Sequence, residues 1–399
     1  MNKQTNTPEL RFPEFDEEWK KRKLGEVVNY KNGGSFESLM KNHGVYKLIT
    51  LKSVNTEGKL CNSGKYIDDK CVETLCNDTL VMILSEQAPG LVGMTAIILN
   101  NNEYVLNQRV AALVPKQFID SQFLSKLINR NQKYFSVRSA GTKVKNISKG
   151  HVENFNFLSP NYTEQQKIGN FFSKLDCQIE LEEQKLAKLE EQKKGYMQQI
   201  FSQQLRFKDE NGNEYPEWEE KKLGDILERG NKDKVNEIGK YRRLTISLHG
   251  KGLYEVKQER KTKDTRPFYQ RFEGELIIGK QNFFNGSIAI VTREFNGFIC
   301  SNAIMSYKIS NHMNRTYLLE YLLQNDFLRK NEYLADGTGQ KELSEKKFEE
   351  LEIKLPNSIN EQQKIGVFLE RLDNLIEKQS NKLELLKQRK KSFLQKMFV

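Results

Sequence analysis

The segment "TEQQKIGNFFSKLD" occupies residues 163–176, and "NEQQKIGVFLERLD" occupies residues 360–373. The two segments are identical at nine of 14 positions and begin 197 residues apart. A second repeated pair lies upstream, because "EWKKRKLGEV" at residues 18–27 recurs as "EWEEKKLGDI" at residues 217–226. Solenoid repeats are about 20–50 residues long and occur in three or more copies. The chain is therefore a twofold internal duplication of a much longer unit.

The repeated segments bracket two interiors that differ in sequence. A lead-in "LRF" opens each half at residues 10–12 and 205–207, and a "GT" pair at Gly141 and Gly337 precedes each copy of the first motif. Between these points the residues diverge. This order predicts a shared structural frame that encloses two dissimilar domains.

Both interiors contain short aliphatic and β-branched runs separated by turn formers, which is the pattern of strands. The first half has "LVMIL" at residues 80–84 and "MTAIIL" at residues 94–99. The second half has "ELIIG" at residues 275–279 and "SIAIV" at residues 287–291. We expect each half to form a mixed α/β (α+β) domain with a mainly antiparallel sheet.

Each copy of the opening motif starts a helical pattern whose apolar residues recur alternately at three and four positions. Polar residues interrupt both patterns at matching points, Glu182 with Gln379 and Lys193 with Lys390. A helix over residues 164–201 would be about 57 Å long at 1.5 Å per residue, which is too long for one domain of this size. The predicted seam residues are Ile168, Phe172, Leu175, Ile179, Leu186, Leu189, Ile365, Leu369, Leu372, Ile376, Leu383 and Leu386.

Two long helices that bury these seams on each other are the favoured arrangement, and an amphipathic helix lying on its own domain is the alternative. The periodicity leaves the relative direction of the helices open. The expected order is a first domain with its lead-in at 1–158, a helix at 159–203, a second domain with its lead-in at 204–355 and a helix at 356–399. Such a duplication predicts a pseudo-twofold axis, as in a symmetric dimer.

The sequence favours a binding protein over an enzyme. The net charge of +11 favours polyanionic partners. No P-loop, H-E-x-x-H, zinc-ligand spacing or nucleophile elbow occurs, and no proline lies in the N/D-P-P-Y/F loop of amino-methyltransferases. The four histidines are scattered. We therefore predict no catalytic, metal-binding or cofactor-binding residues on this chain.

The sequence gives no sign of export or of membrane insertion. The five cysteines include no C-x-x-C pair, no secretory signal opens the chain, and the apolar runs are too short to span a bilayer. We expect a cytoplasmic protein.

Polar loops remain as candidates for contact with DNA, because Lys and Arg suit phosphates while Asn, Gln, Arg and Lys read base edges. We select the loops after the strand runs and after each GT pair, and a solvated turn is the alternative for each of them. The predicted DNA-binding residues are Ser85, Glu86, Gln87, Thr142, Lys143 and Lys145 in the first half, and Lys280, Gln281, Asn282, Thr338, Gln340 and Lys341 in the second.

With these features assembled, the chain resembles the DNA specificity (S) subunits of Type I restriction–modification systems. The resemblance rests on the two E-Q-Q-K-I-G motifs, on the W-x4-L-G openings at Trp19 and Trp218, and on the GT segments before each helix. These features cover nearly the whole chain, twice and in the same order.

The resemblance implies two target-recognition domains, each reading one half of a split DNA sequence, joined by an antiparallel coiled coil. It also implies that the coiled coil sets the spacing and docks two modification subunits, which bind S-adenosylmethionine and methylate adenine. Restriction (motor–nuclease) subunits that use ATP and Mg would join to cleave unmodified double-stranded DNA. The competing interpretations are a stand-alone DNA-modifying or DNA-cleaving enzyme and a non-specific architectural DNA-binding protein.

Overall fold

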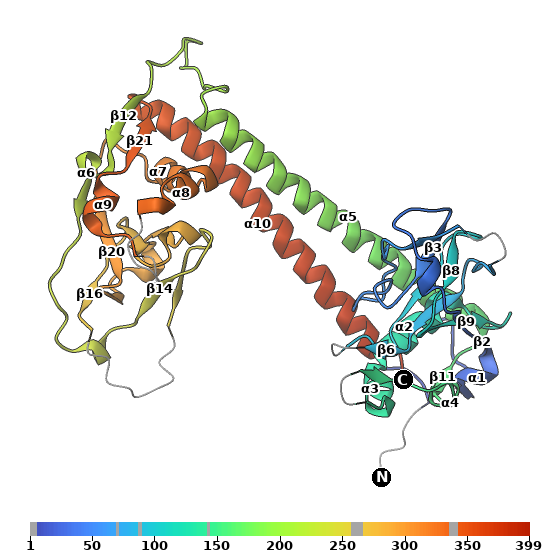
Figure 1. Cartoon of the computed structure of the whole chain (residues 1–399). Coiled ribbons are helices and arrows are strands. Elements are labelled where there is room, and N and C mark those ends of the chain that lie inside the picture. The colour runs from blue at the N-terminus through green and yellow to red at the C-terminus, as the bar shows by residue number, and fades with distance from the viewer. Residues whose placement is uncertain (1–5, 69–71, 87–89, 142–143, 257–265, 335–341) are drawn as a thin grey trace. The chain divides into compact units, whose positions relative to one another are not determined.

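The computed structural model describes residues 6–68, 72–86, 90–141, 144–256, 266–334 and 342–399. The chain divides into two compact units (Figure 1). The first unit comprises Met1–Gln184 and Asn381–Val399, and the second comprises Lys185–Ser380. Each unit therefore contains one domain and part of both long helices.

The first unit is built on a four-stranded antiparallel sheet in the order β2-β9-β5-β7, beside a three-stranded sheet in the order β4-β3-β8. Within the three-stranded sheet β3 and β8 run parallel. Two further pairs, β1-β11 and β6-β10, are antiparallel. The strands are β1 (Lys20–Lys23), β2 (Val28–Asn32), β3 (Tyr46–Ile49), β4 (Tyr66–Ile67), β5 (Leu80–Ile83), β6 (Ser85–Glu86), β7 (Thr95–Ile97), β8 (Tyr104–Leu106), β9 (Val110–Pro115), β10 (Lys145–Asn146) and β11 (Asn156–Ser159).

The second unit repeats this plan with a four-stranded antiparallel sheet in the order β13-β20-β17-β18. The pairs β12-β21, β14-β15 and β16-β19 are also antiparallel. The strands are β12 (Glu219–Lys222), β13 (Leu227–Arg229), β14 (Leu244–Ile246), β15 (Leu253–Glu255), β16 (Phe268–Gln270), β17 (Leu276–Gly279), β18 (Ile288–Ile290), β19 (Ile299–Ser301), β20 (Ile304–Ile309) and β21 (Glu352–Leu355). The expectation of mixed domains with mainly antiparallel sheets is confirmed.

The helices of the two units also correspond in order. The α-helices are α1 (Leu24–Val27), α2 (Ser121–Arg130), α3 (Gln132–Arg138), α4 (Lys149–Glu153), α5 (Tyr162–Phe201), α6 (Leu223–Ile226), α7 (Arg315–Leu322), α8 (Asn325–Lys330), α9 (Glu345–Glu349) and α10 (Ile359–Lys396). Single 3-10 turns occur at η1 (Glu37–Leu39), η2 (Ile238–Lys240), η3 (Phe283–Asn285), η4 (Arg293–Phe295) and η5 (Glu332–Leu334). Both long helices expected from the heptad pattern are present.

The repeated motif forms a buried connection, here called the joint, at the start of each long helix. In the first unit the Glu164 carboxylate is fully buried and accepts two hydrogen bonds of 2.7 Å from the Arg11 guanidinium, which belongs to the lead-in "LRF". In the second unit Arg206 and Glu361 form the same pair, with an Nη2–Oε2 distance of 3.1 Å. A buried carboxylate requires such a partner, because an unpaired buried charge is strongly unfavourable.

The next residues of the motif fix the domain against the helix. Gln165 is buried, its Oε1 accepts from the Asp120 backbone N–H at 3.1 Å, and its Nε2 donates to the Pro160 carbonyl at 3.0 Å. Gln362 repeats both bonds with Asn314 and Pro356, at 2.9 Å each. Asp120 and Asn314 are the N-cap residues of α2 and α7, so one side chain orients two helices in each unit.

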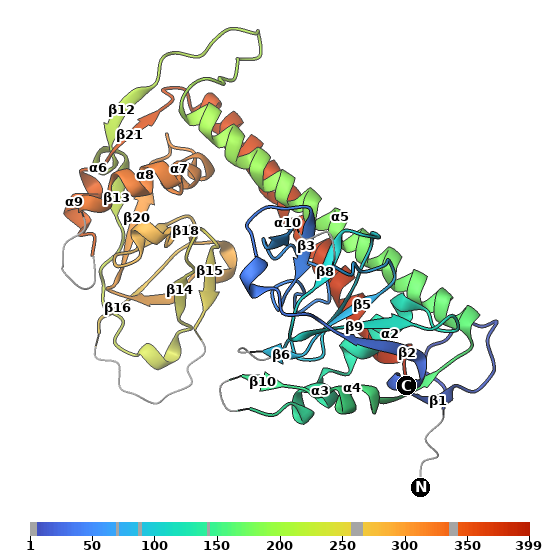
Figure 2. The same cartoon turned by 45° about the vertical axis from the view of Figure 1, so that its right-hand side comes forward.

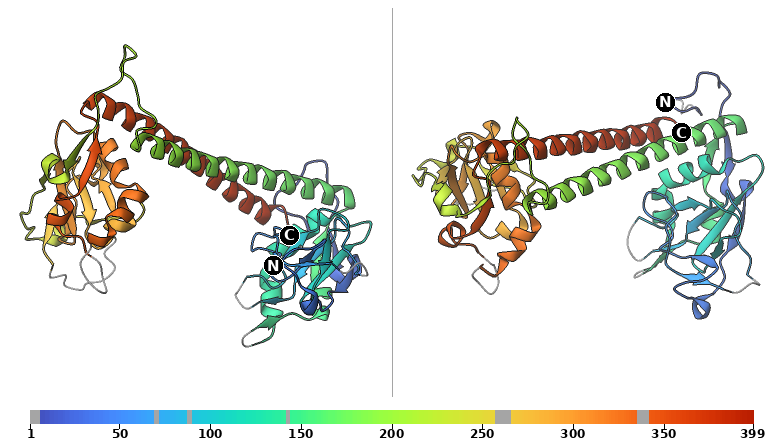
Figure 3. Two further views of the ribbon diagram at one scale, coloured as in Figure 1. Left: turned by 45° about the horizontal axis from the view of Figure 1, so that its top comes forward. Right: turned by 90° about the horizontal axis from the view of Figure 1, so that it is seen from above.

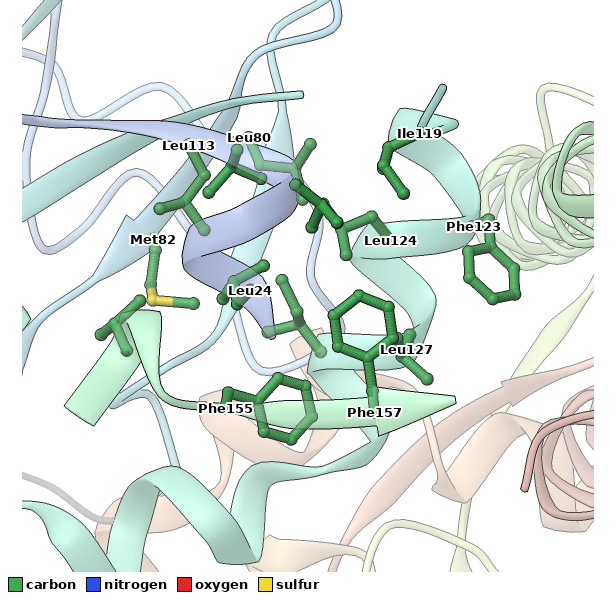
Figure 4. Packing of buried hydrophobic residues seen from close by; sticks show 14 of the residues in the cluster. Leu24, Leu80, Met82, Leu113, Ile119, Phe123, Leu124, Leu127, Phe155 and Phe157 are labelled. Atoms are coloured by element: carbon green, nitrogen blue, oxygen red, sulfur yellow. The ribbon is translucent and has the colours of Figure 1, made fainter. Parts of the chain in front are cut away.

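The ends of the long helices also contribute to the domain cores. Ile168 and Phe172 of α5 lie in the same cluster as Trp19 and Phe123, together with Phe398, which follows α10. Figure 4 shows part of this cluster, where Leu124 of α2 points toward Leu24 and Leu127 lies beside Phe157. In the second unit Ile365 and Leu369 of α10 pack in the same way, with Ile200 of α5. The first turns of each long helix therefore pack in the core of its own domain. The alternative interpretation expected the whole helix to lie on its own domain.

Beyond these ends, α5 and α10 pack on each other in antiparallel fashion (Figure 3). In the first unit Lys390 pairs with Asp176 at 2.6 Å and Lys387 pairs with Glu183 at 2.7 Å. In the second unit Lys193 pairs with Asp373 at 2.7 Å. Partner numbers fall along α10 as they rise along α5, which settles the direction that the periodicity left open. All twelve predicted seam residues are buried or half-buried.

The surroundings of two glycines of α5, Gly169 at the joint and Gly195 away from it, predict opposite effects of alanine on stability. A Cβ added at Gly169 would lie 2.4 Å from Asp120 Oδ1 and 2.9 Å from Gln122 Cβ, whereas one added at Gly195 would meet nothing within 4 Å. We expect Gly169→Ala to lower the free energy of unfolding by about 1–3 kcal/mol through overpacking. Gly195→Ala, the matched control, should raise it by about 0.5–1 kcal/mol through helix propensity. Urea unfolding measures both, and equal effects would refute a close contact at Gly169.

Candidate DNA interface

The two loops that the sequence analysis selected in the first half emerge from one paired ribbon. Strands β6 and β10 are antiparallel, with Ser85 opposite Asn146 and Glu86 opposite Lys145 (Figure 2). Ala140 and Asn146 then exchange two backbone hydrogen bonds of 2.9 Å, which closes the loop after the GT pair. Segments about 60 residues apart in sequence are thereby brought to one place, here called the first edge (residues 84–86, 109 and 145–147).

Within the first edge the predicted residues differ in exposure. Ser85 and Glu86 are buried, at 2% and 5% exposure. The Ser85 hydroxyl contacts the Asn146 side chain, and Glu86 Oε2 accepts from the backbone N–H of Val92 at 2.8 Å. These two side chains hold the ribbon and its loop in place, and their contact with DNA stays a prediction. Lys145 is exposed, and no ion pair joins it to another described residue.

Three of the predicted residues of the first half, Gln87, Thr142 and Lys143, lie outside the described residues. The same holds in the second half for Thr338, Gln340 and Lys341.

The second unit has an equivalent surface, here called the second edge (residues 280–282, 303 and 342–343). The backbone N–H of Lys280 donates to the Ala303 carbonyl at 3.0 Å, and the Lys280 carbonyl accepts from Leu343 at 3.0 Å. Lys280 is half-buried, whereas Gln281 and Asn282 are exposed. The Asn282 side-chain oxygen accepts from the Asn285 amide at 3.3 Å. Three predicted residues therefore lie together at this edge.

The two edges match in backbone and differ in side chains. Leu84 of the first edge donates to the Arg109 carbonyl at 3.0 Å and accepts from Ile147 at 3.0 Å, which repeats both bonds of Lys280. Ile147 and Leu343 are each followed by the N-cap serine of a short helix, α4 or α9. The frame is thus the same, while the residues that follow Leu84 are the buried Ser85 and Glu86 and those that follow Lys280 are the exposed Gln281 and Asn282.

Sequence reasoning missed Arg109, which the fold places beside Leu84 at the first edge. It lies in the turn "LNQRV" between β8 and β9, away from both selected loops. A single cation in a turn is a weak sequence signal. Its position next to Ser85 depends on the pairing of β5 with β9, in which Ile83 lies opposite Val110.

The helix pair carries a buried ionic group in each unit, and the two groups have different charges. In the first unit Asp176 contacts Lys126 of α2 and Lys390 of α10. Burial alone would raise the pKa of Asp176, but the two ammonium groups outweigh it and hold that pKa below its usual value.

In the second unit Lys193 lies 2.9 Å from Glu320 of α7 and 2.7 Å from Asp373. Burial raises the pKa of Glu320 despite the attraction of Lys193, and the nearby Asp373 charge raises it further. Lys126 of α2 and Glu320 of α7 occupy equivalent positions. The aspartate–lysine pair of the long helices therefore contacts a cation of the domain in the first unit and an acid of the domain in the second.

The described residues contain neither a cluster of metal ligands nor a membrane-spanning helix. No group of three or more His, Cys, Asp or Glu side chains there could hold a metal ion. No helix in the described part of the chain is both long and apolar enough to cross a membrane.

Comparison with known proteins places this architecture in a family. The family model of the Type I restriction modification DNA specificity domain matches the chain twice, over residues 16–191 and 215–388. The structure is similar to the S subunit of a Type I restriction–modification system from M. genitalium, with a TM-score of 0.65, 17% sequence identity, and coverage of 98% of this chain and 99% of that one.

A second similar chain comes from a structure that concerns complex assembly and conformational transition of the type I R-M system. It matches with a TM-score of 0.51 and 14% identity, over 95% of this chain and 97% of that one. At these identities the structural likeness concerns the fold, and the double match of the family model decides the family. The chain belongs to the DNA specificity (S) subunits of Type I restriction–modification systems.

Proposed function

We propose that each unit of this specificity subunit reads one half of an asymmetric, bipartite DNA target. The observation that carries the proposal is the contrast between repeated joints and dissimilar edges. Arg11–Glu164 and Arg206–Glu361 repeat one another, whereas the exposed edge residues differ in type and charge. A protein that read two equal half-sites would present the same side chains twice, because base edges are distinguished by hydrogen-bond pattern.

The helix pair, in this proposal, sets the spacing between the half-sites and docks two modification subunits. Several apolar side chains on the helices are exposed, including Leu181 (59%), Leu375 (51%) and Leu385 (47%). Exposed apolar side chains of this size suit a protein partner. The modification subunits would supply S-adenosylmethionine and adenine methylation, and restriction subunits would supply ATP- and Mg-dependent cleavage.

The chain itself, in this proposal, contributes recognition without catalysis. Incubation of the purified chain with DNA and a labelled methyl donor, with and without a modification subunit, tests this point. Label should enter DNA only when the modification subunit is present. Methylation by the chain alone would support the stand-alone enzyme instead.

Exchange of one interior should change one half-site. Replacement of residues 28–147 by the matching region of a relative exchanges both loops of the first edge and keeps the Arg11–Glu164 pair and both long helices. We expect methylome sequencing, with the modification subunit co-expressed, to report a new first half-site and an unchanged second one. The control is the reciprocal exchange of the second interior. A change in both half-sites after one exchange would contradict independent recognition by the two units.

Lys145 is expected to contact phosphate, because it is exposed at the first edge and unpaired among the described residues. Lys145→Ala should weaken binding of the assembled complex to all DNA sequences and reduce the slope of log K against log salt by about 0.9, the value for one lost phosphate contact. Lys20→Ala is the matched control, since Lys20 is an exposed lysine of the repeated frame strand β1. An unchanged slope for Lys145→Ala would exclude this contact.

Helix length should set the spacer length. Insertion of four residues after Glu190 adds about 6 Å to α5 at 1.5 Å per residue and a little more than one turn of 3.6 residues, so the seam nearly keeps its face. At about 3.4 Å per base pair the spacer should grow by up to about two base pairs, with both half-sites unchanged. Four residues inserted between Glu210 and Asn211, outside the helices, form the control and should leave the spacer unchanged. An active α5 insertion with the original spacer would remove the spacing role.

A further inference from the structure

Arg109 has an unusual backbone conformation for its residue type. Its φ is +63°, in the left-handed region, where a bulky side chain is strained and glycine is not. Among the described residues Asp78, Asn102, Gln203 and His249 share this conformation, and Asp and Asn tolerate it through local hydrogen bonds. Strained residues of this kind persist where the surroundings fix them, and they concentrate at functional sites.

The strain is not a property of the repeated frame. Ala303 is the equivalent residue of the second unit, since its carbonyl accepts the same backbone hydrogen bond from Lys280 that Arg109 accepts from Leu84. Ala303 is absent from the described residues with positive φ. The same hydrogen bond therefore forms without a left-handed residue, and the conformation belongs to the first edge alone.

The Arg109 side chain is exposed and has no hydrogen bond or ion pair within the described part of the chain. Glu86, the nearest acid along the ribbon, has its Oε2 occupied by the Val92 backbone N–H. The contacts of the described residues thus give no reason for a guanidinium at this point.

The two edges place their cations on opposite sides of the same backbone hydrogen bond. In the second unit the cation is Lys280 and its partner is Ala303, whereas in the first unit the cation is Arg109 and its partner is Leu84. Each edge therefore carries a cation at this hydrogen bond, in addition to Lys145 at the first edge, although no sequence alignment of the two halves would pair Arg109 with Lys280.

We propose that Arg109 is a specificity-determining residue that reads a guanine in the first half-site. The guanidinium fork matches the O6 and N7 acceptors of guanine in the major groove, and a lysine ammonium lacks this geometry. Arg109 lies in a short turn between β8 and β9, and its carbonyl is held by the Leu84 backbone N–H, so the guanidinium is presented from a fixed backbone. This inference rests on the proposed function of the first unit.

The test uses the full chain assembled with its modification subunit, expressed in a host without other DNA methylation. Arg109→Gly removes the side chain and relieves the backbone strain, so its melting temperature should equal or exceed that of the wild type. Methylome sequencing should then report a first half-site that tolerates other bases at one guanine position, with the second half-site unchanged. Affinity for the cognate site should fall by about 10- to 100-fold, the range for loss of one bidentate base contact.

Arg109→Lys separates a base contact from a phosphate contact. It should lose the selectivity like Arg109→Gly, because charge alone does not reproduce the fork. Arg138→Ala is the matched control, since its guanidinium lies 3.8 Å from the centre of the Tyr134 ring and donates to the Tyr134 carbonyl. That variant should keep the wild-type motif.

Two outcomes would overturn the proposal. An unchanged motif in Arg109→Gly would remove Arg109 from recognition while leaving the bipartite target intact. Wild-type selectivity in Arg109→Lys, with equal loss of affinity on all sequences in Arg109→Gly, would make it a phosphate contact. Failure of the proposed function itself is distinguishable, because the wild-type complex would then methylate no bipartite motif.

Discussion

The paired charges of Arg11 with Glu164, and of Arg206 with Glu361, are the constraint on which each unit depends. A fully buried carboxylate must be neutralised, and among the described residues the cation that pairs with it comes from the lead-in that precedes the domain. The chain before each domain is thereby fixed to the chain after it. The domain between these two segments therefore begins and ends at the joint. Its sequence can differ between the units if its two ends still meet there.

The joint is repeated but not identical in its details. Trp218 donates its indole N–H to Glu361 at 3.2 Å, whereas the indole nitrogen of the buried Trp19 has no partner in the described structure. Trp19 instead packs edge-on against Phe123 and Phe398, with ring centroids 5.9 and 6.4 Å away. The first joint therefore relies more on aromatic packing, and residues after α10 belong to the core of the first unit.

The sequence predicted the elements whose signal is local or repeated. The heptad pattern located both long helices, and short β-branched runs located β5, β7, β17 and β18. It could not predict that Ser85 and Glu86 are buried, because their burial comes from pairing with residues about 60 positions away. Arg109 was missed for the same reason. A heptad pattern also does not say which surface its apolar residues pack against. The packing of Ile168 and Ile365 in the domain cores is therefore known only from the structure.

The ion pairs along the helices make the two halves of the gene non-equivalent. Glu183 pairs with Lys387 in the first unit, but the residues that correspond to them by the 197-residue repeat are Ser380 and Glu190. In a fusion of two first halves, Glu190 of each copy would take the place of Lys387 and lie opposite Glu183 of the other copy. Like charges at such positions repel. Recombination that exchanges only the interiors avoids this repulsion. An exchange of interiors therefore keeps the Glu183–Lys387 pair, whereas a fusion of two first halves would replace it by two acids.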